Sequence, residues 1–239
     1  MTSKGGTKSE KRLSTSKARN LFRKEKMFTI KSHPGIHKRS DSVPLGFVLR
    51  DLLKVCNNLK EAKSILHKGN VFVDGKPRKE YKFPVGLFDV VSLKDLKKNY
   101  VAVFDSLGRI EFKEVKEGKH KICKVLGKRT VKKGKTQIHT NDSRTFREKV
   151  DKIKVSDGIL IELPGQKILK IFELKNGNTV YVFGGTHVST VATVKNIVEG
   201  TMKRPKLLTL EDKEGNEFQT TENNVVVVGD KKAELEVLE

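Results

Sequence analysis

From residue 101 to the C-terminus, the apolar residues come in short runs that end at glycines or polar clusters. Runs of this length, separated by such turns, are typical of antiparallel strands. Residues 101–174 therefore predict a small barrel or curled sheet. Residues 175–239 predict a small antiparallel barrel, closed so that it has no free edge. The expected strands are Val101–Phe104, Ile110–Val115, Ile122–Leu126, Thr136–Thr140, Ile159–Leu163, Ile168–Leu174, Thr179–Phe183, Thr190–Lys195, Leu207–Leu210, Glu217–Thr221 and Val225–Val228.

Residues 43–68 show a helical pattern instead. Six apolar residues have the spacing of one helix face. Asn58, followed by Glu61, predicts a capping box at the start of a second helix, Leu59–Lys68, and Gly69 stands where a left-handed C-terminal cap falls. The residues of the first stripe are Leu45, Val48, Leu49, Leu52, Leu53 and Cys56.

A small sheet follows the second helix. Val71–Val73 predicts a strand, Asp74-Gly75 a two-residue hairpin turn, and Asp89–Leu93 a closing strand. Two helices and a small sheet make one unit of about sixty residues, which is near the lower size for a stable core. We assign its core to Ile65, Leu66, Val71 and Val73.

Residues 1–42 have almost no apolar periodicity and are rich in Lys, Arg, Ser and Gly. Such a segment does not bury enough apolar surface to fold alone. We therefore expect an extended arm that becomes ordered on a polyphosphate surface. Within it, the string HPGIHK from His33 to Lys38 predicts a rigid turn.

The positive charge of the chain, a formal net +21, is unevenly distributed. The net charge is +9 for residues 1–42, +6 for 43–100, +8 for 101–174 and −2 for 175–239. A charge of this size favours a polyanionic partner, because binding relieves self-repulsion and releases counterions. A merely soluble basic surface is the alternative, and the basic N-terminal arm disfavours it.

Composition limits the remaining possibilities. With 36% hydrophobic residues, 6% aromatics and no tryptophan, each core must be small and aliphatic, which favours several modest modules. No apolar run approaches membrane-spanning length, and the N-terminus has no apolar segment typical of a secretory signal. Cys56 and Cys123 form no CxxC pair, which predicts a reduced cytosolic protein without a zinc site.

Several strings resemble a known family. KEAKSILHKG, GNVFVDGK and YKFPVGLFDVVSL resemble the RNA-binding domain named for bacterial small-subunit ribosomal protein four. TVYVFGGTHVSTVATVKNIV, from Thr179, resembles the KOW motif of ribosomal and transcription-elongation proteins. Together with PGIHK, DSLGRIEF, KICKV, HTNDSRTFR and NNVVVVG, their order resembles the archaeal and eukaryotic family of small-subunit ribosomal protein four, which is distinct from the bacterial protein.

This resemblance covers nearly the whole chain and implies an α+β, multidomain fold. The implied parts are a basic extended N-terminal arm (1–42), a small two-helix-plus-sheet RNA-binding domain (43–100), a central β domain (101–174) and a C-terminal SH3-like KOW β-barrel (175–239). Ser189 and Ala192 stand where the resemblance implies glycines. Since a missing Cβ permits close backbone approach, we expect this barrel to contact phosphate less than the two preceding domains.

The resemblance also implies a function. The chain would be a structural constituent of the small ribosomal subunit in the cytoplasm, of archaeal type, that binds and helps fold small-subunit ribosomal RNA. Its partners would be that RNA and neighbouring ribosomal proteins. We expect no cofactor, no metal, no membrane partner and no homo-oligomer.

We expect phosphate contacts on the second helix and the Asp74-Gly75 hairpin, where shape rather than base edges is recognised. These residues are Arg50, Lys54, Lys60, Lys63, Lys68, Lys76, Arg78 and Lys79. The arm residues expected to thread between RNA helices are Lys11, Arg12, Arg19, Arg23, Lys24, Lys38 and Arg39. A further cluster in the central domain consists of Lys128, Arg129, Lys132, Lys133, Lys135, Arg144 and Arg147.

The sequence shows no catalytic constellation. GxSxG, Walker, HExxH and Rossmann patterns are absent, and the six histidines have no metal-ligand spacing. His139 is followed by Asp142, but a turn hydrogen bond explains that pair as well as a reactive site does. Two alternatives stay open: a transcription-elongation or other nucleic-acid-binding regulatory protein and, less favoured, a fragment of an RNA-modifying enzyme. Domains like residues 43–93 also accompany pseudouridine synthases and tyrosyl-tRNA synthetases.

Overall fold

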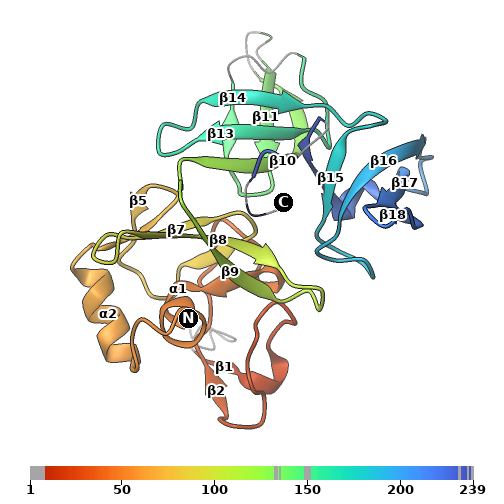
Figure 1. Ribbon diagram of the computed structural model, residues 1–239. Coiled ribbons are helices and arrows are strands. Elements are labelled where there is room, and N and C mark those ends of the chain that lie inside the picture. The colour runs from red at the N-terminus through yellow and green to blue at the C-terminus, as the bar shows by residue number, and fades with distance from the viewer. Residues whose placement is uncertain are drawn as a thin grey trace, which may run out of the picture.

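The computed structural model describes residues 9–131, 134, 136–147, 152–230, 233–235 and 237. It has three lobes, each with one five-stranded antiparallel sheet (Figure 1). Strand order is β5-β4-β7-β8-β9 in the first lobe, β12-β11-β10-β13-β14 in the central lobe and β18-β17-β16-β15-β19 in the C-terminal lobe. No helix of the described chain is long and apolar enough to cross a membrane.

The first lobe contains the helices α1 and α2 and two small pairs of strands, β1 with β2 and β3 with β6. Its elements are β1 (Glu10–Lys11), η1 (Arg12–Ser14), β2 (Phe28–Thr29), η2 (Arg39–Asp41), β3 (Ser42–Pro44), α1 (Leu45–Phe47), the π-helix η3 (Val48–Leu52), α2 (Leu59–His67), β4 (Val71–Val73), β5 (Lys76–Pro77), β6 (Pro84–Gly86), β7 (Val90–Leu93), β8 (Lys98–Phe104) and β9 (Ile110–Val115).

The first expected helix forms but ends before its apolar stripe does. α1 continues directly into η3, where the Leu53 N–H donates to the Val48 carbonyl at 2.8 Å. Val48 and Leu49 are fully buried, as the stripe predicts. Lys54, with φ 51°, then turns the chain out of the helix, so Cys56 reaches the core from a loop.

Helix α2 confirms the second helix and its signals. Asn58 and Glu61 form the capping box, and Gly69 has φ 77° just beyond the C-terminal cap. Leu66 and Val71 are fully buried, so the helix and the following strand close one small core.

The N-terminal segment is not an extended arm: from residue 9 onward it folds onto the first lobe, which corrects our expectation. The buried guanidinium of Arg19 donates to the Glu10 carboxylate (3.0 Å) and to the Ile30 carbonyl (2.8 Å). The Ile110 N–H of β9 donates to the Ala18 carbonyl (2.8 Å). A buried ion pair with its hydrogen bonds thus orders a segment whose composition offers little apolar core.

The strand pairing also differs from the expected boundary at residue 100. β8 spans that position and pairs with β7, and β9 pairs with β8. Residues 101–115 therefore extend the sheet of the first lobe, and a division between β9 and β10 follows the pairing better. Apolar runs predict strands, but they do not say which strand is the neighbour.

The central lobe is organised by β10, which pairs with two strands. Its first half pairs with β13 and its second half with β11, and the register shifts between Val125 and Gly127. The strands are β10 (His120–Thr130), β11 (Thr136–Thr140), β12 (Thr145–Phe146), β13 (Gly158–Glu162) and β14 (Ile168–Phe172).

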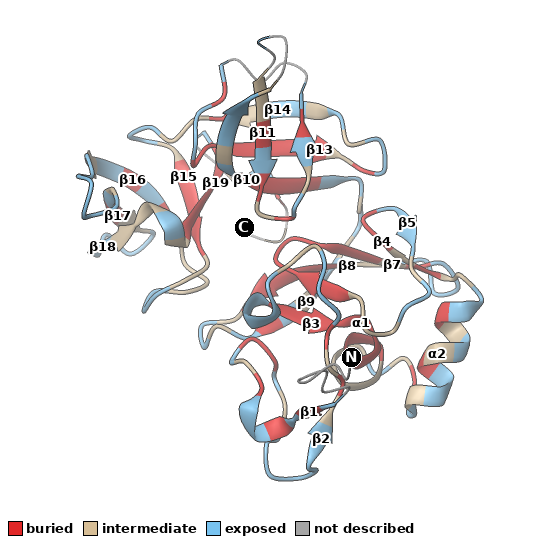
Figure 2. Ribbon diagram, turned by 180° about the vertical axis from the view of Figure 1, so that it is seen from behind, coloured by how far each residue is buried: buried red, intermediate tan, exposed pale blue. Residues whose placement is uncertain are grey.

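The C-terminal lobe has all five expected strands, but its described sheet does not close into a barrel. β18 and β19 are its two edges. β19 instead contacts β10, β13 and β14 of the central lobe, where a Cβ on Gly158 would lie 2.1 Å from the Val227 carbonyl oxygen. The central lobe thus covers this edge, and buried residues continue from β10 and β13 into β19 (Figure 2). The elements are β15 (Thr179–Val182), β16 (Val191–Val198), β17 (Leu207–Asp212), β18 (Glu217–Thr221), η5 (Glu222–Asn224) and β19 (Val225–Gly229).

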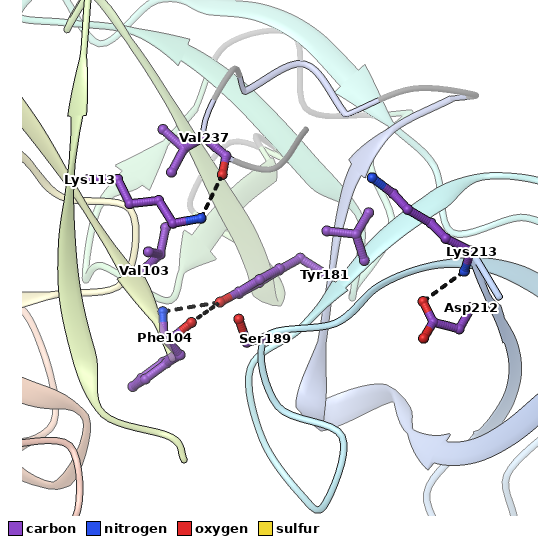
Figure 3. Close-up of a pocket in the computed structure, with 9 residues that line it drawn as sticks. Val103, Phe104, Lys113, Tyr181, Ser189, Asp212, Lys213 and Val237 are labelled. Atoms are coloured by element: carbon purple, nitrogen blue, oxygen red, sulfur yellow. Dashed lines mark hydrogen bonds between the residues drawn. The ribbon is translucent and has the colours of Figure 1, made fainter. Parts of the chain in front are cut away.

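Tyr181 of β15 connects the C-terminal lobe to the first lobe by hydrogen bonds. Its hydroxyl donates to the Phe104 carbonyl and accepts from the Phe104 N–H, both at 3.1 Å (Figure 3). Burial raises the pKa of Tyr181. Ser189 lies beside this hydroxyl with φ 74°, a conformation that favours glycine. A cavity of about 240 Å³ adjoins the contact and is lined also by Val103 and Lys113.

Candidate RNA interface

Helix α2 and its C-terminal cap carry three of the predicted cations. Lys60 and Lys68 are exposed, whereas Lys63 is partly buried. The Lys63 ammonium lies 4.4 Å from the centroid of the Tyr81 ring, and such a cation–π contact restricts the side chain. One of the three charges on this helix is therefore held in a fixed place.

The next three predicted cations lie on strand β5 of the β4–β5 hairpin and directly after it. Lys76 and Lys79 are exposed, and the guanidinium of Arg78 lies 4.3 Å from the centroid of the Phe83 ring. Arg50 and Lys54 line a cleft of about 420 Å³ between the N-terminal segment and the helices. Of the eight cations predicted here, Arg50 alone has a described ion pair, with Asp51 at 2.7 Å.

The predicted cations of the N-terminal segment are of two kinds, exposed and buried. The exposed ones are Lys11, Arg23, Lys24, Lys38 and Arg39, of which Arg39 pairs with Glu10 at 2.8 Å. Arg12 and Arg19 are buried and are committed to protein groups, so neither can reach a phosphate. Burial lowers the pKa of Arg19 despite the opposing effect of Glu10. Both residues leave the candidate interface.

The central lobe brings fewer predicted cations to the surface than expected. Arg129 is exposed, and the exposed residues Lys128 and Arg147 donate to the Ile153 carbonyl (3.1 Å) and the Gln137 side chain (3.0 Å). Lys132, Lys133 and Lys135 lie outside the described residues. Arg144 does not join this group, because it points into the protein.

Arg144 belongs to a buried charge cluster that joins the lobes. The cluster consists of His37, Asp74, Asp89, Lys121, Asp142 and Arg144. Its centre is the Lys121 ammonium, which lies 2.8 Å from Asp74, 2.5 Å from Asp89 and 3.2 Å from Asp142. Asp74, expected at the tip of an exposed hairpin, is therefore an inward-facing ion-pair partner.

The remaining two basic residues, Arg144 and His37, complete the cluster. Arg144 contacts Asp74 through Nη2 (2.5 Å) and Asp142 through Nε (2.7 Å). Nε2 of His37 lies 3.0 and 2.9 Å from the two carboxylate oxygens of Asp89. Backbone N–H groups add further donors, from Val90 to Asp74 and from Gly86 to Asp89.

The mutual proximity of these groups shifts their ionisation. Burial alone would raise the pKa of Asp89, but the charges of His37 and Lys121 outweigh it and hold that pKa well below its usual value. Burial alone would lower the pKa of Lys121, yet the three carboxylates hold it well above its usual value. For Cys123, burial raises the thiol pKa well above the usual value, so this thiol is not a reactive thiolate. The cluster is therefore a set of stable ion pairs.

The buried charge cluster was not predicted, although its members lie in strings that carry the resemblance. PGIHK supplies His37, VDGK supplies Asp74, LFDVV supplies Asp89, KICKV supplies Lys121 and TNDSR supplies Asp142 and Arg144. One signal was available: Asp89 and Lys121 interrupt or adjoin apolar runs. A charge at such a position indicates a buried partner elsewhere in the chain.

Among the described residues, no group of three or more His, Cys, Asp or Glu side chains is placed to hold a metal ion. The candidate interface consists of cations that face outward on the first lobe and the N-terminal segment. The carboxylates of the buried charge cluster lie inside.

Comparison with known proteins adds independent information. The family model described as Ribosomal family S4e matches residues 96–168, a range that includes Lys121, Asp142 and Arg144. The small ribosomal subunit protein eS4 of Methanocaldococcus jannaschii is 39% identical over 240 residues, covering 97% of this chain and 98% of that protein. That of Methanococcus vannielii is 38% identical over 237 residues, with 96% and 97% covered. The crystal structure of the 30S ribosomal protein S4e from Thermoplasma acidophilum matches with a TM-score of 0.69 and 31% identity, covering 81% of this chain and 97% of that one.

Proposed function

The chain belongs to the family of small ribosomal subunit protein eS4, and we propose that the exposed cations of its first lobe and N-terminal segment hold it on ribosomal RNA. It is a structural constituent of the small ribosomal subunit in the cytoplasm. Through this contact it helps to fold the RNA of that subunit.

One observation carries the proposal: in the first lobe, cations face outward while key carboxylates face inward. Lys60, Lys68 and Lys76 are exposed and have no described ion pair, whereas Asp74 and Asp89 are buried. The fold thus buries two of the carboxylates of this lobe and leaves these three lysines exposed, although Glu61 and Glu80 are exposed as well. Release of counterions from the RNA then favours binding.

The mode of recognition follows from the type of side chain. Lysines at the surface bind phosphates as point charges and do not distinguish bases. Lys63 on Tyr81 and Arg78 on Phe83 hold two of the cations in fixed positions. Such an arrangement suits the shape and backbone of a folded RNA junction, which structured RNA presents more readily than its base edges.

The C-terminal lobe contributes less to this contact. Its region has a net charge of −2. Two of its lysines are used internally, Lys195 with Glu217 and Lys206 with Glu199. These pairs leave fewer cations available for phosphate.

The test is the salt dependence of binding to a full-length small-subunit rRNA transcript. Affinity should fall steeply as salt rises, because many phosphates are neutralised together. The triple variant Lys60→Glu, Lys76→Glu and Lys79→Glu should bind more weakly and reduce the slope of log K against log salt by about 2–3. Its thermal unfolding should match that of the wild type, because all three side chains are exposed.

Two results would contradict the proposal. One is a salt response that is flat for the wild type. The other is an unchanged slope for the triple variant, which would show that the contact lies on a different face. Sucrose-gradient fractionation of a cell extract shows with which particle the protein is associated. Sedimentation with small subunits is expected, whereas sedimentation with RNA polymerase would favour the regulatory alternative.

A further inference from the structure

The N-terminal segment exposes an unusual concentration of large apolar side chains. The exposed fractions are 68% for Leu13, 83% for Phe22, 69% for Met27 and 52% for Phe28. Exposed single apolar residues are ordinary, but several in one short segment mark an interaction surface. We call these four residues the apolar face.

The apolar face is held in place by a buried arginine. The Arg12 guanidinium donates to the Phe22 carbonyl at 2.7 Å and pairs with Glu25 at 3.0 Å. The backbone N–H of Arg12 donates to the Met27 carbonyl at 2.9 Å. This role explains why Arg12 is buried within a segment of basic composition: it fixes the loop that displays Phe22.

Two further contacts fix the rest of the face. Arg23 donates to the Leu13 carbonyl at 3.0 Å, which ties the loop to η1. Phe28 lies opposite Lys11 in the β1–β2 pair. All four apolar residues thus stand on backbone that is hydrogen-bonded within the segment, so the face is preorganised for a ligand.

The rim of the apolar face is cationic. Lys11, Arg23, Lys24 and Lys26 are exposed in the same segment, and the carboxylate of Glu25 is paired with Arg12. Phe22 is followed by Arg23, Met27 is preceded by Lys26, and Phe28 lies opposite Lys11 in the strand pair. A nucleotide carries a flat base and a phosphate in one unit, so it matches this alternation of apolar and positive groups.

We propose that the apolar face binds an unpaired, unstacked nucleotide of the small-subunit rRNA, with its base on the Phe22 ring and its phosphates on Arg23, Lys24 and Lys26. The proposal rests on the proposed function and adds a stacking contact to a surface that otherwise recognises phosphate and shape. Aromatic side chains receive splayed bases in this way in single-stranded regions of RNA.

The absence of tryptophan from the sequence supplies a direct probe. Phe22→Trp creates a single indole at the proposed stacking position, and its fluorescence should be quenched on binding a full-length small-subunit rRNA transcript. Met202→Trp is the matched control, because Met202 is fully exposed in the C-terminal lobe. Its fluorescence should change little in the same complex.

A second measurement separates stacking from charge. Phe22→Ala should weaken rRNA binding about tenfold, the loss of one base–aromatic stack, while the salt slope stays as in the wild type. Phe22→Trp should keep the affinity. Met202→Ala should bind as the wild type does.

The outcomes distinguish this proposal from the function on which it rests. If the wild type binds rRNA, but the indole of the Phe22→Trp variant is not quenched and Phe22→Ala binds normally, the stacking contact is overturned and the proposed function stands. If that indole changes its fluorescence only in assembled subunits and not with RNA alone, a protein neighbour covers the face and the proposal is equally overturned. If the wild type does not bind rRNA, the proposed function itself fails.

Discussion

Lys121 illustrates how one side chain can determine the stability of this fold. Only 1% of its side chain is exposed, and its ammonium contacts three carboxylates. A buried lysine would ordinarily lose its proton, but these neighbours keep it charged. Without it, three buried carboxylates would share only Arg144 and His37.

We expect Lys121→Met to lower the free energy of unfolding by about 3–5 kcal/mol, because it leaves buried charge uncompensated. Urea denaturation measures the loss. Lys119→Met is the matched control, since Lys119 is exposed and its pair with Glu117 is at the surface; its effect should be about 0.5 kcal/mol or less. Equal effects of the two changes would contradict a special role for the cluster.

The cluster also makes a specific prediction about acid. Because the pKa of Asp89 is lower in the folded protein than in the unfolded chain, its ionisation stabilises the fold above the unfolded value of about 3.9. That stabilisation is lost as the pH falls from there toward the folded-state pKa. The destabilisation caused by Asp89→Asn should therefore be fully present at about pH 5.

Below about pH 4, the difference in unfolding free energy between Asp89→Asn and the wild type should shrink by roughly 1 kcal/mol per pH unit. Denaturant titrations at a series of pH values give this difference directly. A destabilisation that is the same at pH 3 as at pH 7 would show that the lowered pKa does not contribute.

Among the secondary-structure elements, β19 shows how an exposed edge is avoided without closing a barrel. Its backbone lies against β13, and Gly158 is the residue that permits the approach. At this point main chain of the central lobe lies directly against main chain of the C-terminal lobe.

Gly158→Ala should therefore be strongly destabilising, by about 1–3 kcal/mol or more, because its Cβ would overlap the Val227 carbonyl. Gly127→Ala is the control, since a Cβ at Gly127 meets nothing within 4 Å. Thermal unfolding of the two variants should differ clearly. A Gly158→Ala protein as stable as the Gly127→Ala protein would mean that the two strands separate at little cost.

The elements were largely predictable, whereas their partners were not. The apolar runs located β10, β11 and the strands from β13 to β19 but not the two-residue strand β12, and Asn58 with Glu61 located the start of α2. The same runs assigned β8 and β9 to the wrong sheet and favoured a closed barrel, because alternation carries no information about which edges meet. The end of the first helix was missed because its stripe continues past the turn at Lys54.

Of the candidate interface, the exposed lysines were predictable and the buried arginines were not. Local composition marks Arg12 and Arg19 as arm residues of the same kind as Lys24. Their burial depends on carbonyl and carboxylate partners at Phe22, Glu25 and Glu10, which no periodicity reveals. Polar cores of this kind lack the apolar spacing on which sequence reasoning depends.

For the molecule as a whole, we expect the first lobe to contribute more to RNA binding than the C-terminal lobe does. We expect Lys76→Glu with Lys79→Glu to weaken binding to the rRNA transcript more than Lys203→Glu with Arg204→Glu. Both pairs make the same charge change at exposed positions, but the second pair lies in the C-terminal lobe. Equal losses of affinity in filter-binding assays at fixed salt would show that the C-terminal lobe contributes as much as the first lobe.

The spread of the buried charge cluster along the chain also sets an order of events during synthesis. Asp74 and Asp89 leave the ribosome that makes them well before Lys121 and Arg144 do. At about 5–20 residues per second, the delay is on the order of several seconds. Throughout that interval Asp74 lacks Lys121 and Arg144, and Asp89 has only His37, so the interior of the first lobe is completed by residues that belong to the next lobe.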